Sequence, residues 1–203
     1  VAIRRAIGSL QGPPCESWTI ARFAEFEQDL KAPQPLRLAS LSERHLKQVH
    51  LANVLLQVAH TFYLALVASG GFSVTEHPAE AKWHPRQDIA PSIWKLDETK
   101  LLAGADSSEI LTFNQSIHGS VGSKPTSLLC LRLPTLRYYV RRAQCDFVPC
   151  VRRPGGLIGR ADDGSWRTAP AKEYPPSLCR AIARAMVALA MVVPHDPYAP
   201  VET

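Results

Sequence analysis

The chain has 203 residues, of which 46% are hydrophobic and 20% charged, so it has enough apolar material for one folded domain and is neither disordered nor fibrous. Its net charge of +5 fits an anionic partner such as nucleic acid. Five cysteines at irregular spacing argue against a secreted disulfide framework, and their pattern predicts no metal site.

The N-terminal residues 1–10 lack the continuous apolar core of a signal peptide. The most apolar window, LANVLLQVAHTFYLALVAS, contains Asn53, Gln57 and His60. It is therefore too polar for a typical membrane span and predicts a buried helix of a soluble protein. We expect an intracellular protein that does not bind membranes.

The first half of the chain predicts one strand and two helices. Residues 3–10 indicate a short strand or the tail of a helix, and GPPC ends it because proline cannot donate ladder hydrogen bonds. A helix is expected from near Ser17, followed by a connector. The capping-box pattern that starts at Ser40 opens the strongest predicted helix, about residues 41–69, which two glycines end.

A β-rich run, FSVTEHP, follows that helix at once, which is typical of an α/β sheet. Residues 88–104 predict one or two short helices. The runs EILTFNQ and TSLLCLRL predict two strands of a hairpin, because a short loop with glycine joins them.

The C-terminal part predicts one long helix, at about residues 177–193. Residues 134–170 are rich in proline and glycine and predict an irregular basic segment, and residues 195–203 predict a flexible tail. We therefore expect a single domain over residues 1–194.

Arginines are concentrated in one stretch of about thirty residues. This stretch is either a solvated surface or a strip that contacts phosphates. Its members are Arg132, Arg137, Arg141, Arg142, Arg152, Arg153 and Arg160.

Two reactive side chains follow predicted strands. Cys15 lies on the PPC turn after the first strand, and Glu76 lies near the end of the next strand along the chain. Ligands of open α/β sheets bind beyond the carboxyl ends of the strands. A thiol and a carboxyl group on neighbouring strand ends are therefore expected to converge on one substrate.

These stretches resemble the DNA cytosine-5 methyltransferases, which have a Pro-Cys loop after one strand and Glu-Asn-Val at the end of the next. The matching segments here are GPPCESW, TEHPAE, FNQSIHGSVGSKPTSLLCL and PPSLCRAIARAM, and the resemblance covers nearly the whole chain. The chain is still more similar to divergent methyltransferase-like reading frames of mobile elements, through GPPCESWTIAR, EHPAE, PSIW, SKPTSLL and DDGSWRTAPAKEYPPSLC. The resemblance implies an incomplete Rossmann-like (class I) methyltransferase sheet with flanking helices.

The resemblance also implies a mechanism. In this family a cysteine thiolate adds to carbon 6 of cytosine, a glutamic acid protonates ring nitrogen N3, and S-adenosylmethionine supplies the methyl group. DNA is the implied partner, the target base must be flipped out, and the nucleus is an implied location. The nucleophile would be Cys15 and the acid Glu76. The implied substrate contacts are Pro14, Ser17, Lys124, Arg141 and Arg142.

The chain departs from the family pattern in three places. Glu16 replaces a neutral glutamine beside the thiol, which would raise the pKa of the thiol. His77 and Pro78 replace Asn-Val. The eleven residues before Gly12 contain no Phe-x-Gly-x-Gly, the loop that binds S-adenosylmethionine. We therefore expect a catalytic half that is inactive alone.

Two other functions remain open. The chain is alternatively a non-enzymatic, degenerate mobile-element remnant, or a module that binds nucleic acid through its arginines. A cysteine hydrolase that pairs Cys15 with His77 is a third hypothesis, although no oxyanion loop is evident.

Overall fold

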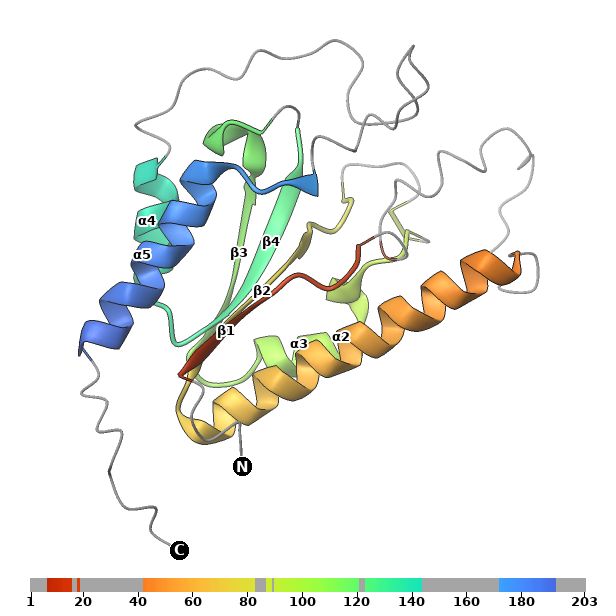
Figure 1. Cartoon of the computed structure of the whole chain (residues 1–203), viewed down its shortest axis with the longest axis horizontal. Coiled ribbons are helices and arrows are strands. Elements are labelled where there is room, and N and C mark those ends of the chain that lie inside the picture. The colour runs from red at the N-terminus through yellow and green to blue at the C-terminus, as the bar shows by residue number, and fades with distance from the viewer. Residues whose placement is uncertain are drawn as a thin grey trace, which may run out of the picture.

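The computed structural model describes residues 7–15, 18, 42–82, 87–88, 90–120, 123–143 and 172–192. The described residues form a mixed α/β structure, as the sequence predicts (Figure 1). In chain order, its elements are β1 (Gly8–Gln11), α2 (Glu43–Ser69), β2 (Phe72–Pro78), η4 (Ile93–Lys95), α3 (Asp97–Ala103), β3 (Ser108–Asn114), η5 (Gln115–His118), β4 (Pro125–Leu131), α4 (Leu136–Ala143) and α5 (Pro176–Val192).

The four strands form one sheet in the order β1-β2-β4-β3. Strands β1 and β2 are parallel, with Gln11 opposite Thr75. Strand β4 pairs antiparallel with both β2 and β3, and it places Thr126 opposite Pro78. The predicted hairpin of β3 and β4 is therefore confirmed. The ends of β1 and β2 and the start of β4 meet at one edge of the sheet.

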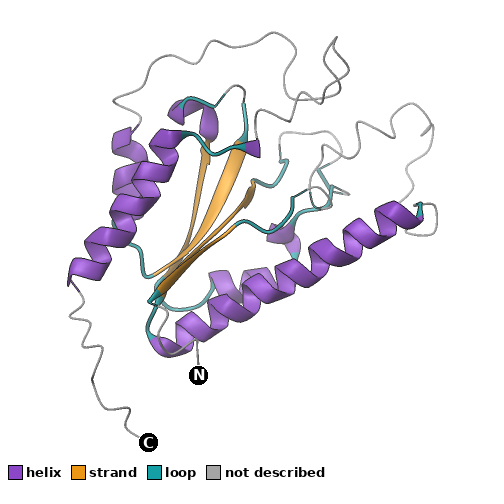
Figure 2. Ribbon diagram, viewed as in Figure 1, coloured by secondary structure: helices purple, strands orange, loops and turns teal. Residues whose placement is uncertain are grey.

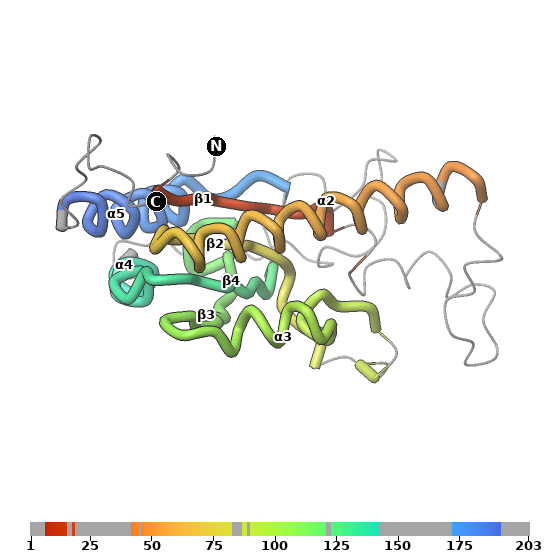
Figure 3. Tube along the Cα trace, turned by 90° about the horizontal axis from the view of Figure 1, so that it is seen from below, coloured from red at the N-terminus to blue at the C-terminus, as the bar shows by residue number. Residues whose placement is uncertain are grey.

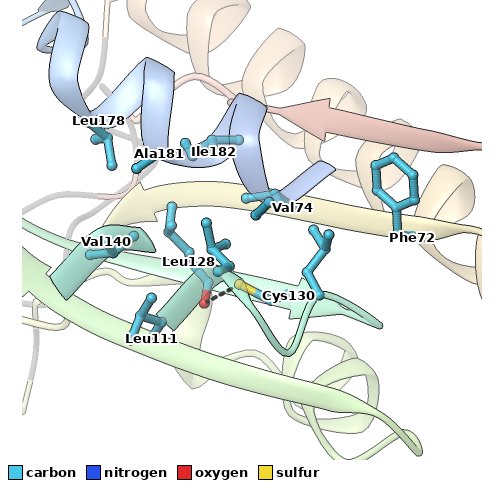
Figure 4. Packing of buried hydrophobic residues seen from close by; sticks show 12 residues of the cluster. Phe72, Val74, Leu111, Leu128, Cys130, Val140, Leu178, Ala181 and Ile182 are labelled. Atoms are coloured by element: carbon cyan, nitrogen blue, oxygen red, sulfur yellow. Dashed lines mark hydrogen bonds between the residues drawn. The ribbon is translucent and has the colours of Figure 1, made fainter. Parts of the chain in front are cut away.

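Helices cover both faces of the sheet (Figure 2). Helices α4 and α5 lie on one face, and α2 and α3 lie on the other (Figure 1). Figure 4 shows Leu178 and Ile182 of α5 packed over Val74 of β2 and Cys130 of β4. On the opposite face, Leu129 of β4 belongs to a second cluster with side chains of α2 and α3. Because helices cover both faces, the side chains of the two central strands, β2 and β4, are buried along nearly their whole length.

Helix α2 ends where its glycines predict. Gly70 has a φ of 75°, in the left-handed region that glycine adopts without steric cost. The Gly71 N–H donates to the Leu66 carbonyl at 2.9 Å, the longer-range bond of a Schellman cap. The helix begins at Glu43, and Ser40 of the expected capping box lies outside the described residues.

The prediction that α2 is a buried helix is wrong for most of its surface. Only one stripe of the helix packs on the sheet, and its N-terminal part projects beyond the strands (Figure 3). The window Leu46–Ser69 is long and apolar enough to cross a membrane, and 28% of it is buried; core helices of soluble proteins pass the same test. The absence of a membrane partner therefore stays a prediction. The exposed large apolar side chains of α2 are Leu46, Leu51, Val54, Leu55, Val58, Phe62 and Leu64.

The remaining predicted elements have mixed outcomes. The strand within residues 3–10 is β1, the short helices of residues 88–104 are η4 and α3, and the C-terminal helix is α5. Residues 134–170 are not irregular throughout, because α4 occupies part of them. The helix expected near Ser17, residues 144–170 and the tail at 195–203 lie outside the described residues.

Helix α4 forms because it buries an apolar pair spaced one turn apart. Leu136 and Val140 are both buried in the cluster that α5 covers. An eight-residue helix is marginal by itself, so this packing, rather than local propensity, stabilises it.

Candidate functional site

The loop that carries Cys15 leaves β1 beside Glu76. Strands β1 and β2 are parallel, and Gln11 lies opposite Thr75. The residues that follow this pair are Gly12, which begins the Cys15 loop, and Glu76 in β2. The Thr75 hydroxyl donates to the Gln11 side-chain oxygen at 2.9 Å and fixes this register. The two strand ends therefore present the Cys15 loop and the Glu76 carboxyl at one edge of the sheet.

Two prolines restrict the loop before Cys15. Pro13 is buried, and Pro14 and Cys15 are half-buried. The fixed φ of proline limits the conformations of this segment. The Trp18 N–H donates to the Cys15 carbonyl at 3.0 Å. Of the predicted substrate contacts, Pro14 lies on this loop, and Ser17 lies outside the described residues.

The Glu76 carboxyl is buried and engaged at both oxygens. The Tyr174 hydroxyl donates to Oε2 at 2.7 Å, and the Gln115 side-chain amide donates to Oε1 at 3.2 Å. Lys124 Nζ lies 3.8 Å from Oε1. Burial raises the pKa of Glu76 above its ordinary value, and the Lys124 charge and the Tyr174 hydrogen bond only partly offset that effect.

Tyr174 lies between the Cys15 loop and Glu76. A Cβ atom added at Gly12 would come within 2.9 Å of the Tyr174 hydroxyl, so this hydroxyl sits directly against the loop backbone. Lys124 Nζ lies 5.3 Å from the centroid of the Tyr174 ring. Burial raises the pKa of the Tyr174 phenol, and the nearby Glu76 and Cys15 charges raise it further.

Three of these groups come from the β3–β4 connection and the start of α5. Lys124 and Gln115 are held together because the Gln115 N–H donates to the Lys124 carbonyl at 3.0 Å. The Lys124 N–H donates in turn to the Asn114 side chain at 2.9 Å. Sequence reasoning named Lys124 but missed Gln115 and Tyr174, and the only available signal was that Tyr174 precedes two prolines in KEYPPSLC.

The predicted arginines lie on α4, outside the contacts described for Glu76. Arg141 and Arg142 are exposed at the C-terminal end of that helix. The Arg142 guanidinium also lies over the Tyr138 ring, 5.8 Å from its centroid. Their role in substrate binding stays a prediction.

His77 faces the opposite side of the sheet from Glu76. Adjacent strand residues point to opposite faces, and the His77 ring packs edge-on against Trp94, with 6.4 Å between centroids. Glu76, in contrast, contacts Tyr174 at the start of α5. Cys15 shares the surroundings of Tyr174, so the geometry does not favour a hydrolytic pair of Cys15 with His77.

Burial of His77 makes a prediction about stability and pH. The side chain is fully buried, and burial lowers its pKa to about 4. A depressed histidine pKa stabilises the fold above the unfolded value of about 6.5, and this stability is lost as the pH falls from there towards 4. We expect the free energy of unfolding to fall by about 3 kcal/mol across that window, measured by urea denaturation.

The variant His77→Phe is the control, because it keeps a ring against Trp94 but cannot titrate. The raised pKa of Glu76 acts with the opposite sign and is common to both proteins, so the difference between their pH profiles isolates His77. Parallel profiles between pH 6.5 and 4 would contradict the assignment of this pH dependence to His77.

Within the described residues, no group of three or more histidine, cysteine or acidic side chains is placed to hold a metal ion. Of the other described cysteines, Cys130 is buried in the core, where burial raises its pKa to about 12, and Cys179 is exposed on α5, where its thiol donates to the Tyr174 carbonyl at 3.8 Å. Comparisons with protein-family models, curated proteins and solved structures found no match for this chain.

Proposed function

We propose that this chain is the catalytic half of a cytosine-5 methyltransferase-like domain built on a Rossmann-like (class I) sheet. The observation that carries the proposal is the placement of the Cys15 loop beside a buried carboxyl group at the ends of two neighbouring parallel strands. A thiol nucleophile and a buried acid within one site are the two groups that addition to a cytosine ring requires.

In the proposed reaction, the Cys15 thiol loses its proton to solvent and its sulfur forms a bond to carbon 6 of the ring. The double bond between carbons 5 and 6 shifts to carbons 4 and 5, the electron pair of the double bond between carbon 4 and N3 moves onto N3, and N3 takes the proton of Glu76, which becomes a carboxylate. Carbon 5 thereby becomes nucleophilic. Burial raises the pKa of Glu76, and this direction supports the role because it favours the protonated form that donates the proton.

S-adenosylmethionine is the methyl donor that the resemblance implies, but the described residues at this site do not fit it. Gly12 is the one described glycine beside Cys15 and Glu76, and the Tyr174 hydroxyl closes the space next to it. No glycine-rich cradle is therefore present among the described residues there. We assign them the addition step alone and expect no methyl transfer by this chain.

The addition step is tested with a single-stranded oligonucleotide that contains one 5-azacytosine. Its ring accepts a thiol at carbon 6 more readily than cytosine, and the adduct needs no methyl donor. A single strand also removes the cost of flipping a base from a duplex. We expect a covalent protein–oligonucleotide adduct that survives denaturing electrophoresis. Its absence would count against the proposed function.

Nucleic-acid binding without catalysis is the second candidate. It is favoured by the composition of two adjacent helices, because neither α4 nor α5 contains an acidic residue. Both helices carry exposed arginines, Arg141 and Arg142 on α4 and Arg180 and Arg184 on α5. Cations without acidic neighbours on their own helices are suited to contact phosphates.

We expect the double variant Arg141→Gln/Arg142→Gln to weaken binding to single-stranded DNA and to flatten its salt dependence. Each lost phosphate contact reduces the slope of log K against log salt by about 0.7. Fluorescence anisotropy over a series of salt concentrations measures the slope. Lys100→Gln is the control, because Lys100 lies on α3 and pairs with Asp97. An unchanged slope of log K against log salt in the double variant would show that these arginines of α4 do not contact the nucleic acid.

A further inference from the structure

We infer that Tyr174 is a positioning residue that holds the Glu76 carboxyl against the loop of Cys15. The inference rests on the proposed function only in giving Glu76 a chemical role. The contact itself links segments that are 98 residues apart, with a hydroxyl-to-carboxyl distance of 2.7 Å. It therefore ties the start of α5 to the end of β2.

The Tyr174 hydroxyl has two neighbours that define its place. One is Glu76 Oε2, to which it donates, and the other is the backbone at Gly12, where even a methyl group would approach the hydroxyl to 2.9 Å. Gln115 donates to the other oxygen of Glu76. The carboxyl group is thus held from two sides, with its Oε2 directed to the hydroxyl that lies against the loop of Cys15.

The local sequence explains why the backbone at Tyr174 has few accessible conformations. A residue before proline is restricted to extended backbone, so Pro175 limits the conformations of Tyr174. Pro175 is itself buried, and Pro176 begins α5, where a missing N–H costs nothing. Leu178, one turn later, is fully buried in the core. The paired prolines and the anchored helix therefore restrict the backbone at Tyr174, and the hydrogen bond to Glu76 holds the phenol.

Lys124 completes the arrangement around the ring. Its ammonium group lies 5.3 Å from the ring centroid of Tyr174 and 3.8 Å from Glu76 Oε1, and its side chain is 16% exposed. The ring thus packs beside the cation that faces Glu76. A phenol that donates to a carboxylate stabilises its ionised form, so the Tyr174 hydrogen bond opposes the effect of burial on the pKa of Glu76.

The test is Tyr174→Phe, which removes the hydroxyl and keeps the ring. The pKa of Glu76 is measured by carbon-13 NMR titration of chain labelled at glutamate side chains, with Glu76→Gln used to assign the signal. We expect the pKa of Glu76 to rise. In the adduct assay, we expect the maximal rate to fall about tenfold, as for loss of one hydrogen bond to a charged group, and the alkaline limb of the pH profile to move to higher pH.

Tyr138→Phe is the matched control for the titration, because Tyr138 is exposed on α4 and contacts Arg142 rather than Glu76. Gly12→Ala is the second variant: it should displace the same hydroxyl and raise the pKa of Glu76 even if Tyr174→Phe folds poorly. A pKa of Glu76 that is unchanged in either folded variant would overturn the inference. If the wild type forms no adduct, the proposed function is contradicted. The titration contains no nucleic acid, so it tests the positioning role of Tyr174 independently of that result.

Discussion

Cys15→Ser is expected to abolish the covalent adduct with the 5-azacytosine oligonucleotide. A serine hydroxyl has no anionic form near neutral pH, whereas a thiol ionises in part and is intrinsically far more nucleophilic. The substitution is nearly isosteric at a half-buried position, so we expect the free energy of unfolding to change little. Denaturing electrophoresis after incubation with excess oligonucleotide measures the adduct.

Cys179→Ser is the matched control for this experiment. Cys179 is exposed on α5 and close in sequence to Tyr174, and it has the accessibility that non-specific thiol addition requires. We expect this variant to form the adduct at the wild-type rate. An adduct that persists in Cys15→Ser and disappears in Cys179→Ser would reverse the assignment of the nucleophile.

Glu76→Gln is expected to slow adduct formation by roughly 10²- to 10⁴-fold, the usual contribution of a positioned general acid. An amide of the same shape can still accept the Tyr174 hydrogen bond with its oxygen, although its NH2 group cannot accept the hydrogen bond of Gln115, and it has no carboxylic proton to give to the ring. It also carries no charge, so its burial does not carry the desolvation cost of a carboxylate. The variant should therefore remain folded, and the single-turnover rate of adduct formation reports the chemistry.

Glu109→Gln provides the comparison. Glu109 also lies on a strand and pairs with a cation, Arg137, at 2.9 Å, but it is far more exposed than Glu76. We expect its adduct rate to match that of the wild type. If the adduct rates of Glu76→Gln and Glu109→Gln were alike, Glu76 would have only a structural role. That result would favour nucleic-acid binding without catalysis, the second candidate function.

The edge of the sheet that carries Cys15 and Glu76 was predictable from the sequence because strand direction decides it. Two strands separated by a helix tend to be parallel, and the carboxyl ends of parallel strands share one edge. The structure brings the Cys15 loop and the end of β2 together in this way and also brings Lys124 to Glu76. The contacts of Tyr174 and Gln115 with Glu76 were not predictable, since they depend on how segments 98 and 39 residues away in the sequence pack against β2.

Two predictions about the fold, for α2 and for α4, were wrong for physical reasons. The burial of α2 was overestimated because apolar residues occur around most of its circumference, while the sheet covers only the stripe through Leu56, Tyr63 and Leu66. Helix α4 was missed because prolines and glycines dominate the segment that follows it, and its own apolar signal is a single pair, Leu136 and Val140. Tertiary packing determines both the burial of α2 and the formation of α4, and the local sequence pattern is a poor predictor of such packing.

The most direct test of the central claim is to map the residue that carries the nucleotide. The chain is incubated with the 5-azacytosine oligonucleotide, digested with nuclease and protease, and its peptides are sequenced by tandem mass spectrometry. We expect the nucleotide mass on the sulfur of Cys15 in the wild type, at a yield that falls sharply in Glu76→Gln. Nucleotide mass on Cys179 or Cys130, or an equal yield on Cys15 in Glu76→Gln, would contradict the pairing of this thiol with this acid.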